Sequence, residues 1–168
     1  MTVKAPVARV FRELLLWGEA SWWPEQSKMR YTRLSSPGDV QVGTRYRQKV
    51  HVRFGPVWDA EITSIGANRE VSFKFLNGMF KGVYRLYVIP EGGLCEVHFL
   101  MDYEVVGLVN RVAWRLMFER KHDENINMLL SAMKSYLEGS QAAVEETGQP
   151  GTVLEAERRK FLQGLIKR

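Results

Sequence analysis

Between residues 44 and 105, apolar and polar side chains mostly alternate. The clearest stretch is Thr44–Phe54, where one face is mostly apolar and the other is basic. The first face comprises Tyr46, Gln48, Val50, Val52 and Phe54, and the second comprises Arg45, Arg47, Lys49, His51 and Arg53. Successive side chains of a strand point to opposite faces, so this pattern predicts a strand with one buried face. Repeated along the chain, it predicts an antiparallel sheet covered on one side only.

Turn residues separate the remaining predicted strands. Asn77-Gly78 is the strongest hairpin signal, and Pro37-Gly38-Asp39, Gly55-Pro56 and Gly92-Gly93 mark other turns. The predicted strands are Met29–Ser36, Thr44–Phe54, Trp58–Thr63, Glu70–Leu76, Phe80–Ile89 and Leu94–Val105, with a very short one within Met1–Ala5. We therefore expect six to seven strands.

Helical spacing appears at both ends of this strand region. Pro6–Trp17 predicts a helix ended by Gly18, and Glu19–Trp23 predicts a second short helix stopped before Pro24. Leu108–Leu137 predicts one long amphipathic helix. Its clean apolar stripe comprises Ile126, Leu129, Leu130, Met133 and Leu137. Strands followed by a single closing helix predict an α+β helix-grip fold, in which a curved antiparallel sheet wraps around the C-terminal helix.

Composition divides the chain once. Residues 1–138 form one predicted domain, and Glu138–Gly151 is rich in Gly, Ser, Ala, Glu and Pro, as linkers are. Leu154–Ile166 then predicts a short basic amphipathic helix. Docking of this helix on the domain or on a second subunit is favoured over a membrane-surface role.

Bulk properties narrow the class of protein. The chain has 168 residues, a net charge of +5 and a single cysteine, Cys95, which excludes an intrachain disulfide and fits a reducing compartment. No apolar run approaches the roughly 18 residues of a membrane span, and the N-terminus lacks the layout of a signal peptide. We expect a cytoplasmic protein without a transmembrane segment.

Short motifs resemble a known superfamily. The segments VKAPVARVFRELL and WGEASWWPE are similar to the opening of the START and birch-pollen-allergen-like superfamily. GTRYRQKV, WDAEITSIGANREVSFKF and GVYRLYVIPEGGLCEVHFLMDYEVVG are similar to its middle. The resemblance covers about Met1–Glu138, and the branch that looks most similar is that of polyketide cyclase/dehydrase-like and coenzyme-Q-binding-like proteins. The shape and the resemblance together imply a hollow between sheet and helix that binds hydrophobic molecules.

Candidate ligand-binding residues lie on the dry face of the sheet and on the helix. Aromatic walls with a few polar groups are typical of sites for apolar ligands. The sheet candidates are Tyr46, Gln48, Trp58, Phe73, Tyr84, Met101 and Tyr103, and the helix candidates are Val112, Leu116 and Glu119. A filled core is the alternative interpretation of the large apolar ones.

The front half of the long helix permits two interpretations. Extending its apolar stripe backwards points Arg115, Glu119 and His122 into the hollow, where they could anchor a ligand or act as acid or base. A kink near Lys121–Asn125 would instead move them to the rim or to solvent, which we favour. Trp114 and Phe118 would then be exposed unless another surface packs on them. A homodimer through these residues or through the C-terminal helix is one possibility.

Other patterns have plainer explanations. The basic row on Thr44–Phe54 is interpreted as a solvated outer face paired with Asp59 and Glu61, and not as a nucleic-acid site. His98 and Asp102 share a face, but Cys95 lies on the other, so no nucleophile is near. The histidines and the cysteine lack metal-ligand spacing. We assign no catalytic residue, metal or cofactor.

Three functions are therefore considered. The leading hypothesis is binding or carrying of a hydrophobic small molecule, such as a lipid, a quinone or a polyketide-like compound. The first alternative is an enzyme of the polyketide cyclase/dehydrase type, in which tyrosine, arginine or glutamate groups steer the chemistry. The second alternative is a protein–protein interaction module.

Overall fold

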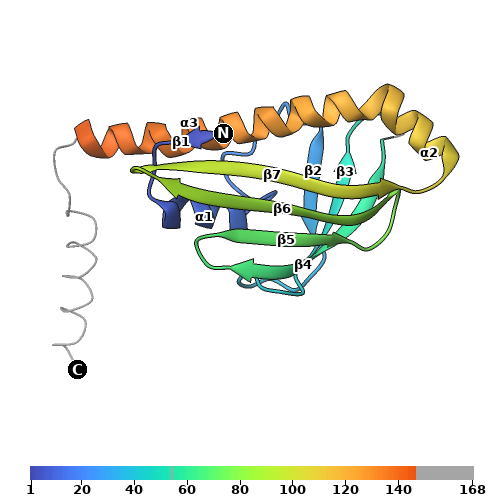
Figure 1. Ribbon diagram of the computed structural model, residues 1–168, viewed down its shortest axis with the longest axis horizontal. Helices are drawn as coiled ribbons and strands as arrows, with labels where there is room; N and C mark the ends of the chain where they lie inside the picture. Colours follow the sequence, from blue (N-terminus) through green and yellow to red (C-terminus); the bar gives the residue numbers. More distant parts are fainter. Residues whose placement is uncertain (54, 147–168) are drawn as a thin grey trace.

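Seven antiparallel strands form one sheet in the order β1-β7-β6-β5-β4-β3-β2, and a long helix runs along it (Figure 1). This computed structural model describes residues 1–53 and 55–146, and side chains as far as residue 139. The strands are β1 (Thr2–Val3), β2 (Met29–Arg33), β3 (Arg45–Val50), β4 (Val57–Gly66), β5 (Glu70–Phe75), β6 (Phe80–Glu91) and β7 (Leu94–Val105). The helices are α1 (Val7–Leu15), α2 (Leu108–Ala113), the π-helical turn η1 (Trp114–Phe118) and α3 (Glu119–Glu146).

The sheet is a meander closed by one distant strand. Each strand from β2 to β7 pairs with the next in sequence, and β1 pairs with β7 through Val3 and Cys95. Gly82 of β6, with φ of 120°, lies opposite Tyr103, and a Cβ there would collide with the Asp102 carbonyl oxygen. Glycine therefore permits the close approach of β6 and β7 at this point. The predicted α+β helix-grip fold is confirmed.

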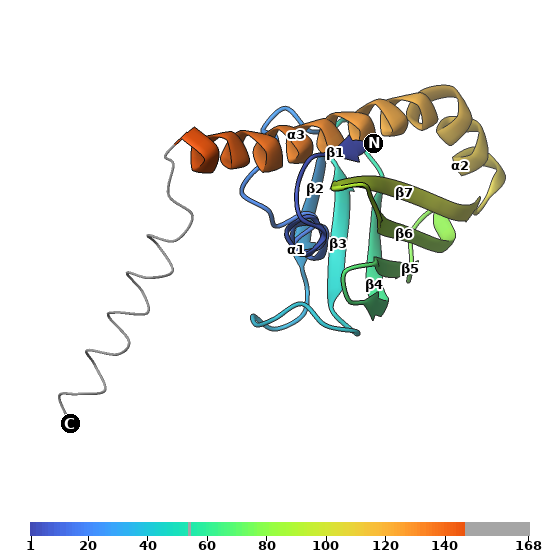
Figure 2. The same ribbon diagram turned by 60° about the vertical axis from the view of Figure 1, so that its left-hand side comes forward.

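The inner side of the sheet is covered by α1 and α3, which lie against the same concave side (Figure 2). The buried core is contributed by both helices and by alternating strand positions. The stripe predicted for the long helix is confirmed, because Ile126, Leu129, Leu130, Met133 and Leu137 are all buried. No helix in the described part of the chain is both long and apolar enough to cross a membrane.

The predicted second helix at Glu19–Trp23 is wrong, because these residues form turns. Five residues followed by Pro24 are too few to offset the cost of nucleating a helix. Side chains hold the segment instead: the Trp22 indole N–H donates to buried Glu13 at 2.9 Å, and the Trp23 indole donates to the Met29 carbonyl at 3.2 Å.

The long helix extends further than predicted. α3 ends at Glu146, so residues 139–146, expected in a linker, are helical. The predicted helix Leu154–Ile166 lies outside the described residues. At the other end, Gly107 takes φ of 86° and starts α2, and the Arg111 N–H donates to its carbonyl at 3.0 Å.

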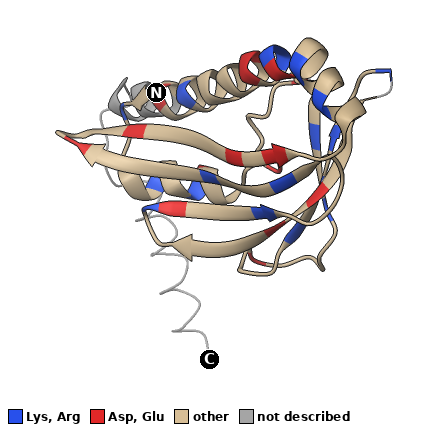
Figure 3. Cartoon of the chain, turned by 45° about the vertical axis from the view of Figure 1, so that its right-hand side comes forward, with Lys and Arg blue, Asp and Glu red and all other residues tan. Residues whose placement is uncertain are grey.

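The predicted pairing of the basic row with Asp59 and Glu61 is seen for Arg45 and Arg47; β3 ends at Val50, so His51 and Arg53 lie beyond the strand. Arg45 Nε lies 2.6 Å from Glu61 Oε2, and Arg47 contacts both carboxylate oxygens of Asp59, at 2.8 and 3.0 Å. The hydrogen bond from Arg47 lowers the pKa of the Asp59 carboxyl below its usual range. Across-strand pairing therefore accounts for this outer face (Figure 3).

Candidate functional site

The interior between sheet and helix is packed. Five predicted ligand residues on the sheet, namely Tyr46, Gln48, Trp58, Phe73 and Tyr84, are each no more than 2% exposed. Phe73 and Tyr84 stack with ring centroids 4.5 Å apart. The Trp58 indole N–H donates to Gln48 Oε1 at 2.7 Å, and Gln48 Nε2 donates to the Tyr84 hydroxyl at 2.6 Å. Burial raises the pKa of Tyr84 well above its usual value. Gln48, Trp58 and Tyr84 satisfy one another, whereas the buried Tyr46 hydroxyl has no partner among the described residues; the burial of all five side chains makes this part of the fold a core.

The other predicted residues lie in three different places. Met101 and Tyr103 are half-buried in an open groove between β7 and α3. The Tyr103 hydroxyl accepts from the Trp114 indole at 2.9 Å and lies 3.5 Å from exposed Glu119. Val112 and Leu116 face solvent, with 51% and 77% of their surface exposed. The helix candidates therefore do not meet the sheet candidates at one site.

A pocket does lie nearby, where the front of the long helix crosses the ends of β2, β3 and β4. Its volume is about 320 Å³. Its walls are mainly apolar and comprise Lys28, Met29, Val50, Val52, Arg53, Trp58, Trp114, Met117, Phe118, Lys121, His122 and Asn125. Trp58 is the one predicted ligand residue that lines it. Pockets for small molecules commonly measure roughly 300–1,000 Å³, so this one suits a compact ligand.

The π-helical turn decides which side chains reach the pocket. It widens the turn at Trp114–Phe118 and shifts the register of the residues before it relative to α3. Trp114 is consequently buried against Phe80, with ring centroids 4.7 Å apart, and Phe118 lines the pocket. Trp114 and Phe118 therefore face their own domain and do not need the cover expected from a second subunit, whereas a homodimer itself stays a prediction.

Among the helix residues of the pocket, His122 was expected to face the hollow in one of the two interpretations, whereas Trp114, Met117 and Phe118 were missed although a signal was present. Trp114, Phe118, His122, Ile126 and Leu130 recur at every fourth position. In a regular α-helix such a row drifts around the axis, and a wider turn keeps more of it facing the sheet. The spacing thus marks the inward face, whereas extrapolation at 3.6 residues per turn selected Val112, Arg115 and Glu119 together with His122, of which only His122 lines the pocket.

Asn125 supplies a polar group with spare bonding capacity. Its Oδ1 accepts from the Ser27 hydroxyl at 3.1 Å and from the Lys28 backbone N–H at 3.3 Å. The backbone N–H can only donate, which fixes the orientation of the amide. Asn125 Nδ2 is then a buried donor without a protein partner among the described residues. A buried donor without a partner is unusual, and it belongs here to a residue that also lines the pocket.

His122 stands between the pocket and the groove beside β7, and it lines both. Only 11% of its side chain is exposed, and its ring lies 5.5 Å from Trp114 and 5.9 Å from Phe99, centroid to centroid. Burial lowers the pKa of the imidazole, against a weaker opposing effect of Asp123. His122 is therefore neutral at pH 7, whereas Arg115 and Glu119 are exposed.

This lowered pKa predicts a pH dependence of stability. Below the ordinary histidine pKa of about 6.5, the unfolded chain binds a proton that the folded His122 resists. The free energy of unfolding should therefore fall as pH drops from 7.5 to 5, and a His122→Gln variant should lose less over this range. Urea unfolding at each pH measures the difference. A His51→Gln variant, altered at an exposed position, is the control; equal pH slopes in all three proteins would contradict the burial of His122.

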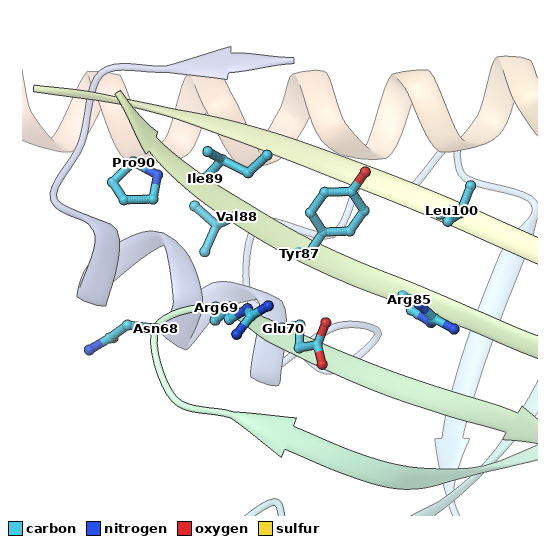
Figure 4. Close-up of a pocket in the computed structure, with 9 residues that line it drawn as sticks. All are labelled: Asn68, Arg69, Glu70, Arg85, Tyr87, Val88, Ile89, Pro90 and Leu100. Carbon is cyan, nitrogen blue, oxygen red and sulfur yellow. The ribbon is translucent and has the colours of Figure 1, made fainter. Parts of the chain in front are cut away.

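A second hollow lies on the outer face of the sheet (Figure 4). Its volume is about 580 Å³, and it is open to solvent. Glu70 lies between Arg69 and Arg85 on its floor, and the Tyr87 ring stacks on His98 with centroids 4.8 Å apart. Its charged side chains are accessible to solvent, and the hollow does not enclose an apolar surface. It is a weaker candidate for a ligand site than the pocket beside the helix.

The described residues form no cluster suited to binding a metal ion. Within residues 1–53 and 55–139, no three His, Cys, Asp or Glu side chains lie close enough together to hold a metal ion. The Cys95 thiol is buried and donates to the Ala5 carbonyl at 3.3 Å. His98 lies on the outer face beside Tyr87, so Cys95 and His98 are apart, as the strand parity predicts.

Comparison with known proteins identifies the family. The model of the family described as polyketide cyclase/dehydrase and lipid transport matches residues 1–138. The chain belongs to this family. The resemblance to the START and birch-pollen-allergen-like superfamily is thereby confirmed. Among proteins with curated functions, none matches the sequence significantly.

Solved structures of the family's fold agree with this assignment. The protein TTHA0849 from Thermus thermophilus is 19% identical, with a TM-score of 0.64, over 83% of this chain and 94% of that one. The major latex-like protein 151 of Panax ginseng is 13% identical, with a TM-score of 0.58, over 82% of this chain and 93% of that one. At such identities the likeness concerns the fold alone, and the function must be argued from the pocket.

Proposed function

We propose that this protein binds a hydrophobic, ring-containing small molecule that carries a carbonyl-type oxygen, in the pocket beside the π-helical turn. One observation carries the proposal: an apolar pocket lined by Asn125, whose amide nitrogen is a buried donor without a partner among the described residues. Apolar walls supply affinity through burial, and one placed donor supplies orientation. The family's description, which joins polyketide chemistry to lipid transport, is consistent with ligands of this kind.

The size of the pocket restricts the ligand. A volume of about 320 Å³ accommodates two or three fused rings but not a whole membrane lipid. The packed network of Gln48, Trp58 and Tyr84 blocks deeper penetration, because it leaves almost no accessible surface. We infer that the ring system sits between Met29, Trp58 and Phe118, and that longer substituents leave through the mouth.

Catalysis is the second candidate, and His122 is the observation that favours it. A neutral imidazole on the pocket wall is a general base in its active form. Such a base could remove the proton next to a ligand carbonyl, with Asn125 Nδ2 donating to the developing enolate oxygen. Carrier and enzyme would then share one binding mode and differ only in whether this proton moves.

Binding is tested with 1-tetralone and tetralin, two bicyclic compounds that differ only by a carbonyl group. Both should quench the fluorescence of Trp58 and Trp114 and raise the melting temperature. Tetralin is the more apolar compound, so burial alone would favour it; a hydrogen bond from Asn125 should make tetralone bind more tightly. Isothermal titration gives both dissociation constants. Tighter binding of tetralin would contradict a role for Asn125.

Two tryptophan substitutions locate the site. Val50→Trp fills the pocket and should abolish binding of 1-tetralone, whereas Val112→Trp places the same bulk on the exposed side of α2 and should leave binding unchanged. Equal binding by both variants would place the ligand elsewhere.

Hydrogen–deuterium exchange of 1-tetralone in deuterium oxide, followed by NMR, distinguishes a carrier from an enzyme. Exchange that the parent catalyses and the His122→Gln variant does not would indicate the enzyme.

A further inference from the structure

The front of the long helix exposes a continuous apolar surface. Leu108, Val109, Val112, Leu116 and Met117 are between 51% and 81% exposed, and we call these five residues the helix-front patch. Leu108, Val112 and Leu116 follow one another at four-residue spacing, so they form a stripe on one side of the helix. Large apolar side chains gathered in this way mark an interaction surface.

The domain itself leaves the stripe uncovered. The π-helical turn brings Trp114 and Phe118 to the sheet, and α2 contributes no buried residue. A helix that buries aromatic residues on one side and exposes leucines on the other contacts apolar material on both sides. The described part of the chain supplies that material on one side only.

Basic residues flank the helix-front patch. The stretch 108–121 contains Arg111, Arg115, Arg120 and Lys121 and a single acidic residue, Glu119. Figure 3 shows Lys and Arg positions following one another along this part of the helix. Glu104 lies 2.8 Å from Arg111, Glu124 lies 2.8 Å from Arg120, and Asp123 is exposed next to them, so the positive excess of this surface comes from Lys28 and Arg53 at the mouth of the pocket.

The loop between β3 and β4 also combines apolar and basic side chains. Val52 and Arg53 line the pocket together with Met117 and Lys121, so the loop between β3 and β4 lies beside the helix front. Val52 is exposed, as is Val57 at the start of β4. Apolar and basic side chains from two elements thus form one end of the molecule, around the mouth of the pocket.

We propose that this end of the protein docks on an anionic lipid bilayer, with the helix-front patch in the interface and the basic residues against lipid phosphates. Apolar side chains flanked by Lys and Arg are the pattern of helices that lie in a membrane surface. A second copy fits less well, because a two-fold contact would bring the arginines of both copies together. Docking does not depend on the ligand proposed above. In the docked orientation, the mouth of the pocket would face the bilayer.

Vesicle flotation tests this proposal. The protein should float with vesicles of phosphatidylcholine containing about one-third phosphatidylglycerol, and much less with phosphatidylcholine alone, because an anionic surface attracts Lys and Arg side chains. A Leu108→Ser/Leu116→Ser variant should bind at least about tenfold more weakly, since two large side chains no longer enter the interface. A Leu94→Ser/Leu100→Ser variant, altered at exposed leucines of the outer sheet face, is the matched control and should bind as the parent does.

The outcomes separate docking from ligand binding. Equal flotation of both double variants, or flotation independent of phosphatidylglycerol, would overturn the proposal. So would a parent that does not float but forms dimers lost in Leu108→Ser/Leu116→Ser, because a second copy would then cover the patch. Neither leucine lines the pocket, so this variant should bind 1-tetralone like the parent. Flotation without tetralone binding would support docking alone, and the reverse result would support the pocket alone.

Discussion

A Gln48→Leu variant should lose about 2–6 kcal/mol of its free energy of unfolding. Leucine can neither donate nor accept a hydrogen bond, so it leaves the Trp58 indole N–H and the Tyr84 hydroxyl without the partners found 2.7 and 2.6 Å away. Each buried polar group deprived of its partner costs about 1–3 kcal/mol. Because a domain is stable by only about 5–15 kcal/mol, the effect should be plain in urea unfolding followed by circular dichroism.

The control for this prediction is Gln41→Leu, at an exposed glutamine that precedes β3. It should change the free energy of unfolding by less than about 0.5 kcal/mol. The comparison also bears on function. If the interior were hollow and hydrated, water would replace Gln48 and its loss would cost little; a small effect would thus contradict the packed core and reopen a deep ligand cavity.

A Leu129→Asp variant should be largely unfolded and should therefore show no cooperative melting transition. Leu129 is completely buried where α3 packs on the sheet, and an unpaired carboxylate there costs several kcal/mol in addition to the lost apolar burial. Asn127→Asp, two positions earlier on the exposed side of α3, should melt like the parent. Calorimetry or thermal circular dichroism distinguishes them, and similar melting of the two variants would show that α3 is dispensable for the core.

The strands were predictable because each has one solvent-exposed face and one buried face, so that polar and apolar residues alternate along it. Alternation placed β3 to β7 within a few residues of their observed ends, and the turn at Asn77-Gly78 was predicted by its residues alone. The same alternation predicted the Arg47–Asp59 pairing across the sheet. The short segment Glu19–Trp23 was mistaken for a helix because its contacts are with Glu13 and Met29, which no local pattern reveals.

The site was harder to predict than the fold. Strand parity shows that Tyr84 and Gln48 face inward, but it cannot show whether they line a hollow or bond to each other. That distinction depends on how far the sheet closes on the helix, which is a property of the whole domain. The helix residues were misplaced for a separate reason: a single π-helical turn shifts the register, so that Trp114 is buried where Val112 was expected.

The order of strands in the sheet also bears on how the chain folds. Strands β2 to β7 meet through neighbours in sequence, so their loops close at small entropic cost. β1 joins from the far end, and the Met1 amino group reaches the Val97 carbonyl across 96 positions. Until it arrives, the edge of β7 around Cys95 and Val97 offers unpaired backbone groups that another chain could join. The short first strand thus shields a nascent sheet from intermolecular association, a kinetic role larger than its two residues would indicate.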